Sequence, residues 1–475
     1  MIIRLRRIVF WFLVAVYLIA CPWLLLYARG IILQPARTMD PLVETGLIHV
    51  ATQPAGARLF LENRRFAQKT PTAIRELLPG PYRLSIRLNG HRPWERTIQV
   101  QPSKTGMLDP ILLLPRRIRI QPIGTTAWTR LFPLEKTGFL FLASGKTAQQ
   151  CALYEVDRNR LYPVPVPWPK ARLKTVHHEP GSRRLLLEGE AGGARKWLAV
   201  SLSEKPAARD LTPLIPEGTE EILWDPSAPE QLFAVEGTAV HRIDTEQGAL
   251  FPRWLEGVRG LAAREGQLTV LKTSGRLEWE PLADRTDPTV LDDSGEALDW
   301  LEETFYRIHR MTETTTLFLG GRGQLLSSRL PHLLEENGVR GLRPEGRTKQ
   351  AAVWTGKRLA LLDLEPEPAA AGGFEKGATL DWVYSRGREI RQAVWVRRGA
   401  YLLILDRDTV RLLETATRKD PALNWSETGA LEEILEVRPG SGIHWDERRG
   451  ILYGLERKSG RLFRAALAPP RKEGL

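Results

Sequence analysis

The sequence predicts an all-β protein with an N-terminal transmembrane helix, a small β-sandwich and then a seven- or eight-bladed β-propeller. Near the N-terminus, residues 8–28 form an uninterrupted run of 21 uncharged residues. Glycine and proline are plentiful, at 40 and 34 residues, which favours many turns and short strands. Beyond about residue 120, short apolar runs alternate with polar turns and recur roughly every 40–50 residues, the period of propeller blades.

The uncharged run is long enough to cross a bilayer, whose core of about 30 Å needs about 20 apolar residues in a helix. Arg4, Arg6 and Arg7 precede it. Basic residues on this short flank favour a cytoplasmic tail at residues 1–7, with the rest of the chain outside. We therefore expect a single-pass cell-membrane protein, anchored at residues 8–28 and largely extracytoplasmic.

Two other readings of this segment stay open. A cleaved signal peptide normally has an apolar stretch of about 7–15 residues followed by a small-residue cleavage site, and neither feature is present here. Leu18-Ile19-Ala20-Cys21 resembles a bacterial lipobox, in which Cys21 would become a lipidated N-terminus. Pro22 and the continuing apolar residues favour the uncut anchor.

The charge of +12 is concentrated next to the anchor. After a linker at 29–45, residues 46–120 hold 13 Lys and Arg against four Asp and Glu, whereas residues 121–475 hold 50 of each. Such a field attracts anionic lipid head groups or polyanionic envelope polymers, and a well-solvated surface is the alternative. No nucleic-acid-binding signature accompanies it. The candidate anion contacts are Arg83, Arg87, Arg92, Arg96, Arg116 and Arg117.

Residues 46–115 predict the sandwich. Apolar residues alternate with polar ones from Tyr82 to Asn89, as in a strand with one buried and one basic face. Further short strands and turns suggest a small antiparallel β-sandwich. Gly56 and Gly80 are expected to supply turns with positive φ. Trp94 is expected to pack in the core, with ligand stacking as the alternative.

The same segment resembles the PEGA domain. The resemblance rests on Pro54-Ala55-Gly56-Ala57, Thr70-Pro71, Leu78-Pro79-Gly80-Pro81-Tyr82 and Leu88-Asn89-Gly90-His91. Ala55 replaces the Glu of the name motif, and His91 replaces the usual aromatic residue. PEGA domains are small extracytoplasmic β-domains of prokaryotes, so the resemblance implies envelope attachment or scaffolding and no catalytic residues.

Residues 120–470 predict the propeller. An apolar pair, a Trp, a turn and a second strand recur around Trp224, Trp354, Trp395 and Trp445. We expect these tryptophans to pack between blades. Two or more β-sandwiches in series are the alternative architecture, and residues 329–339 are expected to break the repeat as a short helix or long loop.

The sequence contains no complete catalytic, phosphate-binding or metal-binding motif. Ser144-Gly145-Lys146-Thr147 lacks the first Gly of a phosphate-binding loop, and His177-His178 would point to opposite faces of a strand. We predict no enzyme activity, cofactor or metal, and a binding or scaffold role with a protein or glycan ligand on the propeller. The alternative is an anchored propeller enzyme acting on cell-wall polysaccharide or peptide. Three or more His, Asp or Glu side chains converging at the propeller centre would favour it.

Overall fold

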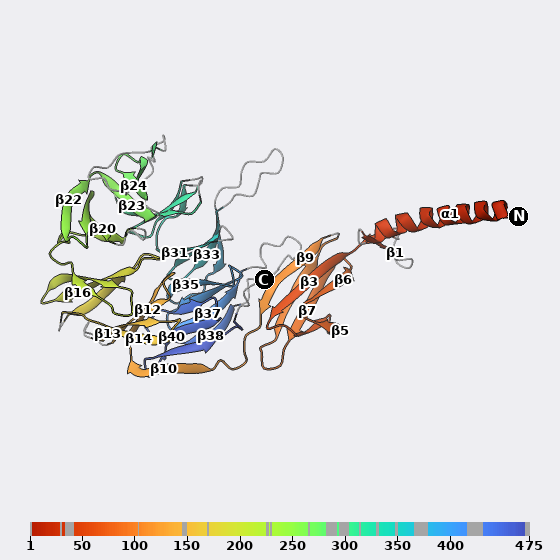
Figure 1. The fold of residues 1–475 in the computed structure, drawn as a ribbon, viewed down its shortest axis with the longest axis horizontal. Helices are drawn as coiled ribbons and strands as arrows, with labels where there is room; N and C mark the ends of the chain where they lie inside the picture. The colour runs from red at the N-terminus through yellow and green to blue at the C-terminus, as the bar shows by residue number, and fades with distance from the viewer. Residues whose placement is uncertain are drawn as a thin grey trace.

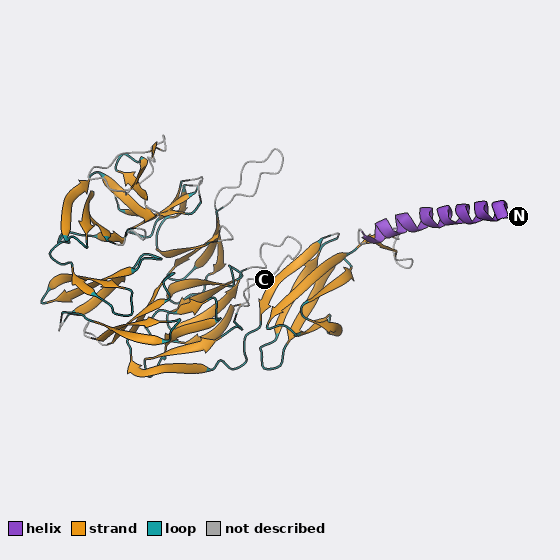
Figure 2. Cartoon of the chain, in the orientation of Figure 1, coloured by secondary structure: helices purple, strands orange, loops and turns teal. Residues whose placement is uncertain are grey.

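The structure is a computed structural model. It describes residues 2–28, 31–33, 42–102, 104–144, 150–168, 171–224, 228, 230–264, 267–281, 292–293, 304–312, 315–328, 332–346, 350–364, 379–415 and 431–470. Figure 1 shows one N-terminal helix, then a small two-sheet body, then a larger body of short sheets. Every other regular element is a strand (Figure 2). The chain is therefore all-β apart from its first helix, as predicted.

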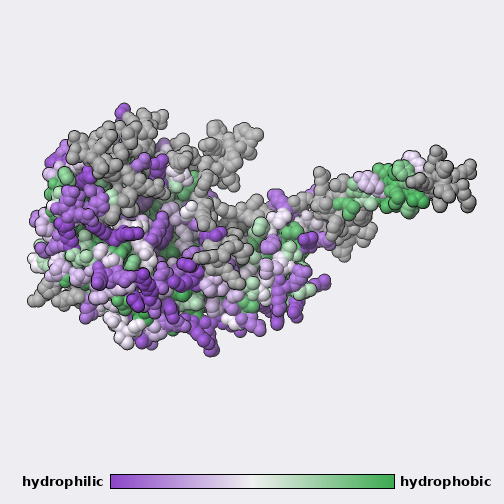
Figure 3. All heavy atoms as spheres, viewed as in Figure 1, coloured by the Kyte–Doolittle hydropathy of each residue, from purple (hydrophilic) through white to green (hydrophobic). Residues whose placement is uncertain are grey.

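Helix α1 (Ile2–Ala28) begins earlier than expected, because it includes residues assigned to a cytoplasmic tail. Most of its described large apolar side chains are exposed, with Ile19 the most exposed at 75%, and the helix shows green in Figure 3. Among the described residues, no helix is both long and apolar enough to cross a membrane, so the expected span is not confirmed.

The segment expected to be a linker contains a small hairpin. Strands β1 (Ile31–Leu33) and β2 (Leu42–Glu44) pair antiparallel, with Ile31 opposite Glu44. Because β1 starts three residues after α1 ends, this pairing brings the start of the sandwich next to the end of the helix.

The sandwich consists of sheets β6-β3-β9 and β5-β4-β7-β8. Its strands are β3 (Gly46–Gln53), β4 (Arg58–Leu61), β5 (Arg64–Lys69), β6 (Thr72–Leu77), β7 (Gly80–Arg87), β8 (Trp94–Val100) and β9 (Thr105–Leu112). Alternate residues fill one core, including Ile48, Leu59 and Leu84. Gly56 and Gly80 have φ of +85° and +149°, as predicted. The expectation of a wholly antiparallel sandwich is wrong, since β3 and β9 run parallel.

The remaining strands form eight four-stranded units, here called blades 1 to 8. Blade 1 is β11 (Arg130–Leu134), β12 (Phe139–Ser144), β13 (Gln150–Glu155) and β14 (Arg160–Val164); blade 2 is β15 (Arg172–His177), β16 (Arg184–Ala191), β17 (Ala194–Ser201) and β18 (Ala208–Asp210). Blade 3 is β19 (Glu221–Trp224), β20 (Gln231–Glu236), β21 (Ala239–Asp244) and β22 (Ala249–Leu255); blade 4 is β23 (Val258–Arg264), β24 (Gln267–Lys272), β25 (Leu277–Pro281) and β26 (Asp292–Asp293).

The order continues in the same way through the second half of the chain. Blade 5 is β27 (Tyr306–Arg310), β28 (Thr316–Gly320), β29 (Leu325–Ser327) and β30 (Leu333–Glu335); blade 6 is β31 (Val339–Glu345), β32 (Gln350–Thr355), β33 (Leu359–Asp363) and β34 (Leu380–Tyr384). Blade 7 is β35 (Ile390–Val396), β36 (Tyr401–Asp406), β37 (Thr409–Glu414) and β38 (Leu431–Glu436). Blade 8 combines β39 (His444–Asp446), β40 (Ile451–Leu455) and β41 (Arg461–Ala466) with β10 (Ile120–Ala127) from the start of this region.

The eight blades close into a ring. Seven separate buried clusters each join one blade to the next, in chain order from blade 1 to blade 8. The eighth cluster closes the circle, because Tyr453 and Leu455 of blade 8 pack with Leu140 and Leu142 of blade 1. Strand β10 adds a second closure by pairing with β41. The region is therefore an eight-bladed β-propeller, and sandwiches in series are excluded.

The recurrent tryptophans lie where the prediction places them, between blades. Trp224, Trp354 and Trp445 are each at least 92% buried in inter-blade clusters, and Trp395 packs against the same cluster as Trp354. Their repeats are not equivalent, however, since Trp354 lies on the second strand of its blade and the others on first strands. The break expected at residues 329–339 is wrong over its described part, where β30 completes blade 5.

Candidate functional site

The first strand of each blade lies nearest the axis of the ring. Contacts join β19 to β23, β23 to β27, β31 to β35 and β35 to β39, all of them first strands. Gly260 of β23 even pairs with Tyr306 of β27, which merges blades 4 and 5 into one sheet. Polar side chains on these strands, and just after them, therefore gather at the centre of the ring.

Two ion pairs lie at this centre. Arg307 of blade 5 lies 2.7 Å from Glu221 of blade 3, and Arg343 of blade 6 lies 2.9 Å from Glu135, which directly follows the first strand of blade 1. Neither pair joins adjacent blades, so each links two separate parts of the ring on its inner side. The side chains of Arg307 and Glu135 remain 54% and 38% exposed, which leaves the centre open to water.

The carboxyl of Glu179 lies within the field of Arg307, Glu135 and Glu221, and among the described residues this carboxyl has no hydrogen-bond or ion-pair partner. Burial raises the pKa of its carboxyl, Arg307 lowers it, and Glu135 and Glu221 raise it further. The carboxyl thus faces both ion pairs and is biased toward its protonated form. We call Glu135, His177, Glu179, Glu221, Arg307 and Arg343 the central cluster.

The histidines at the centre are biased toward the neutral form. Burial lowers the pKa of His177, although its Nε2 lies 3.3 Å from Glu188. Burial lowers the pKa of both His309 and His444 to about 4, with Arg307 and Arg343 respectively adding to the shift. His178 turns away to the carbonyl oxygen of Ser182, so the pair His177-His178 is divided between two surroundings.

The central cluster was invisible to linear motifs, because its members come from five blades. Each is a single charged residue or histidine beside an apolar strand, and that pattern is common on any surface. Within the described residues, no three His, Cys, Asp or Glu side chains are placed to hold a metal ion. The sequence Ser144-Gly145-Lys146-Thr147, compared above with a phosphate-binding loop, lies outside the described residues after Ser144.

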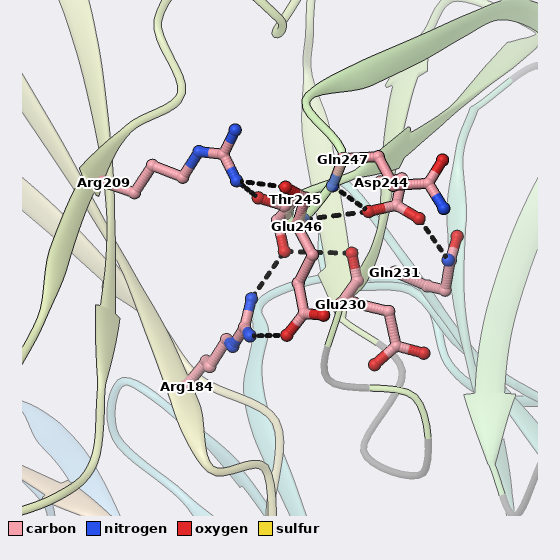
Figure 4. A network of polar contacts seen from close by, with 8 residues as sticks. All are labelled: Arg184, Arg209, Glu230, Gln231, Asp244, Thr245, Glu246 and Gln247. Atoms are coloured by element: carbon pink, nitrogen blue, oxygen red, sulfur yellow. Dashed lines mark hydrogen bonds and ion pairs between the residues drawn. The ribbon is translucent and has the colours of Figure 1, made fainter.

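A second polar network, between blades 2 and 3, is structural (Figure 4). Asp244 accepts hydrogen bonds of 2.8 Å from the backbone NH groups of Glu246 and Gln247, which fixes the turn after β21. Arg184 donates to the Thr245 hydroxyl and pairs with Glu246, while Arg209 donates to the carbonyl oxygens of Thr245 and Glu246. These contacts join blade 2 to blade 3 at the turn after β21.

A third polar site joins the sandwich to the propeller. Glu414 of blade 7 is 6% exposed and accepts hydrogen bonds of 3.3 Å from both the Trp94 indole and the Arg96 guanidinium. Burial raises the pKa of Glu414, and Arg96 lowers it in part. Nearby, the backbone NH of Leu112 donates to the Tyr401 hydroxyl at 2.8 Å. Leu112 and Leu114 belong to the buried cluster between blades 7 and 8, so the two bodies share a core.

The predicted anion contacts fall into three groups. Arg92 and Arg96 face the propeller, where Arg92 binds Glu432 at 3.3 Å and the Glu433 carbonyl oxygen. Arg83 and Arg87 lie on the outer face of the sandwich and share Glu95. Arg116 and Arg117 are exposed in the connection before β10. Cys21 is partly exposed on α1.

Comparison with known proteins supports the PEGA resemblance. Residues 45–110 match the family model of the PEGA domain, and no curated protein matches the chain. BamB from Moraxella catarrhalis has 12% identity and a TM-score of 0.44, covering 74% of this chain and 100% of its own. The β-propeller domain of Cps50 (Swd1) from Myceliophteria thermophila has 12% identity and a TM-score of 0.40, with the same coverage. The assignment of the propeller therefore does not depend on these two structures. It depends on the order of the strands in the eight sheets and on the closure of the ring. The chain therefore carries a PEGA domain followed by an eight-bladed propeller.

Proposed function

We propose that this protein is a membrane-anchored scaffold of a prokaryotic envelope, which holds its PEGA domain and propeller outside the membrane as one rigid unit. The observation that carries the proposal is the joint between the two bodies. Glu414 is enclosed by Trp94 and Arg96, and Leu112 enters the propeller core. A flexible tether would need none of these buried contacts, whereas a scaffold that sets the orientation of a binding surface does.

The anchoring part of the proposal is supported by the N-terminal sequence. Residues 8–28 carry no charge, and the described apolar side chains of α1 are exposed around the helix. Exposed apolar area costs about 25 cal/mol per Å² in water, so such a helix favours an apolar environment. The arginines at positions 4, 6 and 7 favour a cytoplasmic N-terminus.

The binding part of the proposal places a protein or glycan ligand over the centre of the ring. The central cluster offers guanidinium groups and carboxylates side by side, with Arg307 and Glu135 exposed to water. Such a mixture recognises polar, hydrogen-bonding ligands rather than apolar ones.

The test is the membrane topology of the full chain, tagged at its C-terminus, in bacterial cells. We expect the protein to stay in the membrane fraction at alkaline pH, and the tag to be digested by protease from outside the cytoplasmic membrane. Substituting Arg4, Arg6 and Arg7 by Glu should reduce outward orientation. A protein released at alkaline pH, or a tag protected from protease, contradicts the proposal. The intact mass distinguishes a chain beginning at Met1 from one lipidated at Cys21.

A catalytic function is a second candidate, favoured by the central cluster itself. Three carboxylates and a histidine meet there, and the pKa of Glu179 is raised as in many general acids. On this view the enzyme would hydrolyse cell-wall polysaccharide or peptide. Purified protein should then cleave wall fragments, the Glu179→Gln variant should lose that activity, and Glu246→Gln, in the structural network, should keep it. Absence of cleavage by the unaltered protein removes this candidate.

A further inference from the structure

The outer face of the sheet β5-β4-β7-β8 is strongly basic. Strand residues opposite one another share a face, and Arg58 lies opposite both Lys69 and Arg87. Leu59, next to Arg58, is fully buried in the core, so this row of three cations points away from it. Arg65 and Arg83 lie on the same face by the same alternation.

Two carboxylates lie near these five cations in the described residues, namely Glu62, which accepts a hydrogen bond of 2.6 Å from the backbone NH of Arg83, and Glu95. Glu95 binds Arg83 at 3.0 Å and Arg87 at 3.2 Å, and these hydrogen bonds, with one from Ser85, lower its pKa. The part of the chain that the structure describes places no carboxylate within ion-pair distance of Arg58, Arg65 or Lys69. All three of these residues are exposed.

Like charges directly opposite on neighbouring strands are unfavourable, by roughly 0.2–1 kcal/mol per pair. Arg58 carries two such neighbours, Lys69 on one side and Arg87 on the other. The row therefore lowers the stability of the isolated sheet unless an anion covers it. Phe60, two residues along β4 from Arg58, lies under the Arg87 guanidinium at 5.0 Å and holds it over the face.

The position of the row decides which anion can reach it. The start of β7 lies at the end of the sandwich that is next to α1. Gly80, the first residue of β7, is opposite Val100, and the Val100 side chain packs against Gly46, where the sandwich begins. Arg87 is seven residues further along β7, about 23 Å away at 3.3 Å per residue. Charges in physiological salt are screened beyond about 8 Å. Lipid head groups around α1 therefore act weakly on this row, whereas a free chain lying along the sheet reaches all of it.

We propose that the row Lys69–Arg58–Arg87, with Arg65 beside it, binds a linear polymer other than a nucleic acid that carries a phosphate at each repeat. Lys and Arg groups on neighbouring strands lie about 5 Å apart, which lets consecutive phosphates meet consecutive cations, and the guanidinium groups can bind phosphate oxygens in pairs. The location of this polymer in the envelope rests on the proposed function. The binding of the polymer does not depend on that function, because it requires only the cations of this face.

The test measures binding of long-chain inorganic polyphosphate to the detergent-solubilised full chain over a series of salt concentrations. The variant R58Q/K69Q/R87Q should bind on the order of 100-fold more weakly at low salt, since three close contacts are lost. Its plot of log affinity against log salt should be shallower by about two, at about 0.7 per contact. The matched control is R158Q/R253Q/R457Q, which loses the same charge at exposed positions of the propeller and should bind within about threefold of the unaltered protein.

Three outcomes overturn the proposal. Equal losses in the face variant and the control mean that net charge alone governs binding. A face variant that loses affinity for phosphatidylglycerol vesicles but keeps its affinity for polyphosphate assigns the face to lipid. A single-stranded oligonucleotide of equal charge that binds more tightly than polyphosphate assigns it to nucleic acid. Thermal unfolding of the face variant at or above the temperature of the unaltered protein shows that the variant is folded, and all of these results are independent of the topology test.

Discussion

Arg307 and Glu221 are 86 residues apart in the chain and belong to blades 5 and 3, with blade 4 between them. Their side chains nevertheless meet at 2.7 Å at the centre of the propeller. The contacts of β19 with β23 and of β23 with β27 bring these two blades together at the centre. With the Arg343–Glu135 pair, the Arg307–Glu221 pair ties four blades together at the axis.

The coupling between Arg307 and Glu221 can be measured by a double-mutant cycle. Because Arg307 is half exposed, we expect R307Q and E221Q each to change the free energy of unfolding by less than about 1 kcal/mol. Their coupling should be about 0.2–1 kcal/mol, and E221Q/R343Q, which joins residues of different pairs, serves as the control with coupling near zero. Urea unfolding measures all of these values. Equal coupling in both cycles would contradict the arrangement at the centre.

Substitutions at Glu414 should separate the roles of its shape and its charge. E414A leaves the Trp94 indole and the Arg96 guanidinium without their acceptor and should cost about 1–3 kcal/mol. E414Q keeps one acceptor oxygen and removes a buried charge, so it should cost less than E414A at pH 7. Thermal unfolding and protease cutting between the sandwich and the propeller give the two readouts. Equal losses in both variants would show that the charge itself is required.

The same residue predicts a dependence on pH. The pKa of Glu414 is raised above 4.5 in the folded chain, so the folded state binds more protons between 4.5 and that raised value. Its contribution to stability is present below pH 4.5 and is lost as the pH rises through the raised pKa. We expect the difference in stability between the unaltered protein and E414Q to change across this window. A constant difference from pH 4 to 7 contradicts it.

Two partly buried histidines, His309 and His444, predict the opposite slope. The pKa values of His309 and His444 fall from 6.5 to about 4, so the unfolded state binds more protons between these limits. Their contribution is present above pH 6.5 and is lost as the pH falls through 4, on the order of 1–3 kcal/mol for each residue. Unfolding of the E414Q variant isolates this effect, and H309Q/H444Q should flatten its pH profile. If the stability of that variant falls with pH as steeply as before, groups other than His309 and His444 cause the loss of stability in acid.

Cys151 should report on the interface between blades 1 and 2. It is 4% exposed within the cluster that joins them, and burial raises the pKa of its thiol to about 12. In a Cys21→Ser background, where it is the single cysteine, we expect no maleimide labelling of the folded protein at pH 7.5 and full labelling in denaturant. Mass spectrometry measures both. Rapid labelling of the folded protein would show that this inter-blade core is open.

The repeat pattern allowed the propeller to be predicted because each blade is a local unit. Its strands and turns depend on residues close in sequence, and apolar runs such as Ala393-Val394-Trp395 show on which strands the inter-blade packing falls. The blade count stayed at seven or eight because β10 is separated from its partner β41 by more than 330 residues, and no local signal links them. The pairing of β1 with β2 was missed for a related reason, since three-residue strands carry too little alternation to recognise.

The basic face was predicted in part. Arg83 and Arg87 were found from the alternation along a single strand, and they do lie on the outer face. Arg92 and Arg96 looked equivalent in sequence, yet they bind Glu432 and Glu414 of the propeller. The charges along one strand do not show whether the propeller covers that strand. Arg58 and Lys69 were not predicted as anion contacts, because their position beside Arg87 depends on how the strands pair.

The sequence by itself determined the all-β class, the PEGA domain, the uncharged N-terminal run and the burial of the tryptophans, because all of these depend on composition and on periods shorter than one blade. Only the tertiary structure decided the closure of the eight blades, the central cluster, the joint at Glu414 and the row Lys69–Arg58–Arg87. Each of these brings together side chains whose distance in space depends on ring closure or on strand pairing, and that distance has no counterpart in the linear order of the residues.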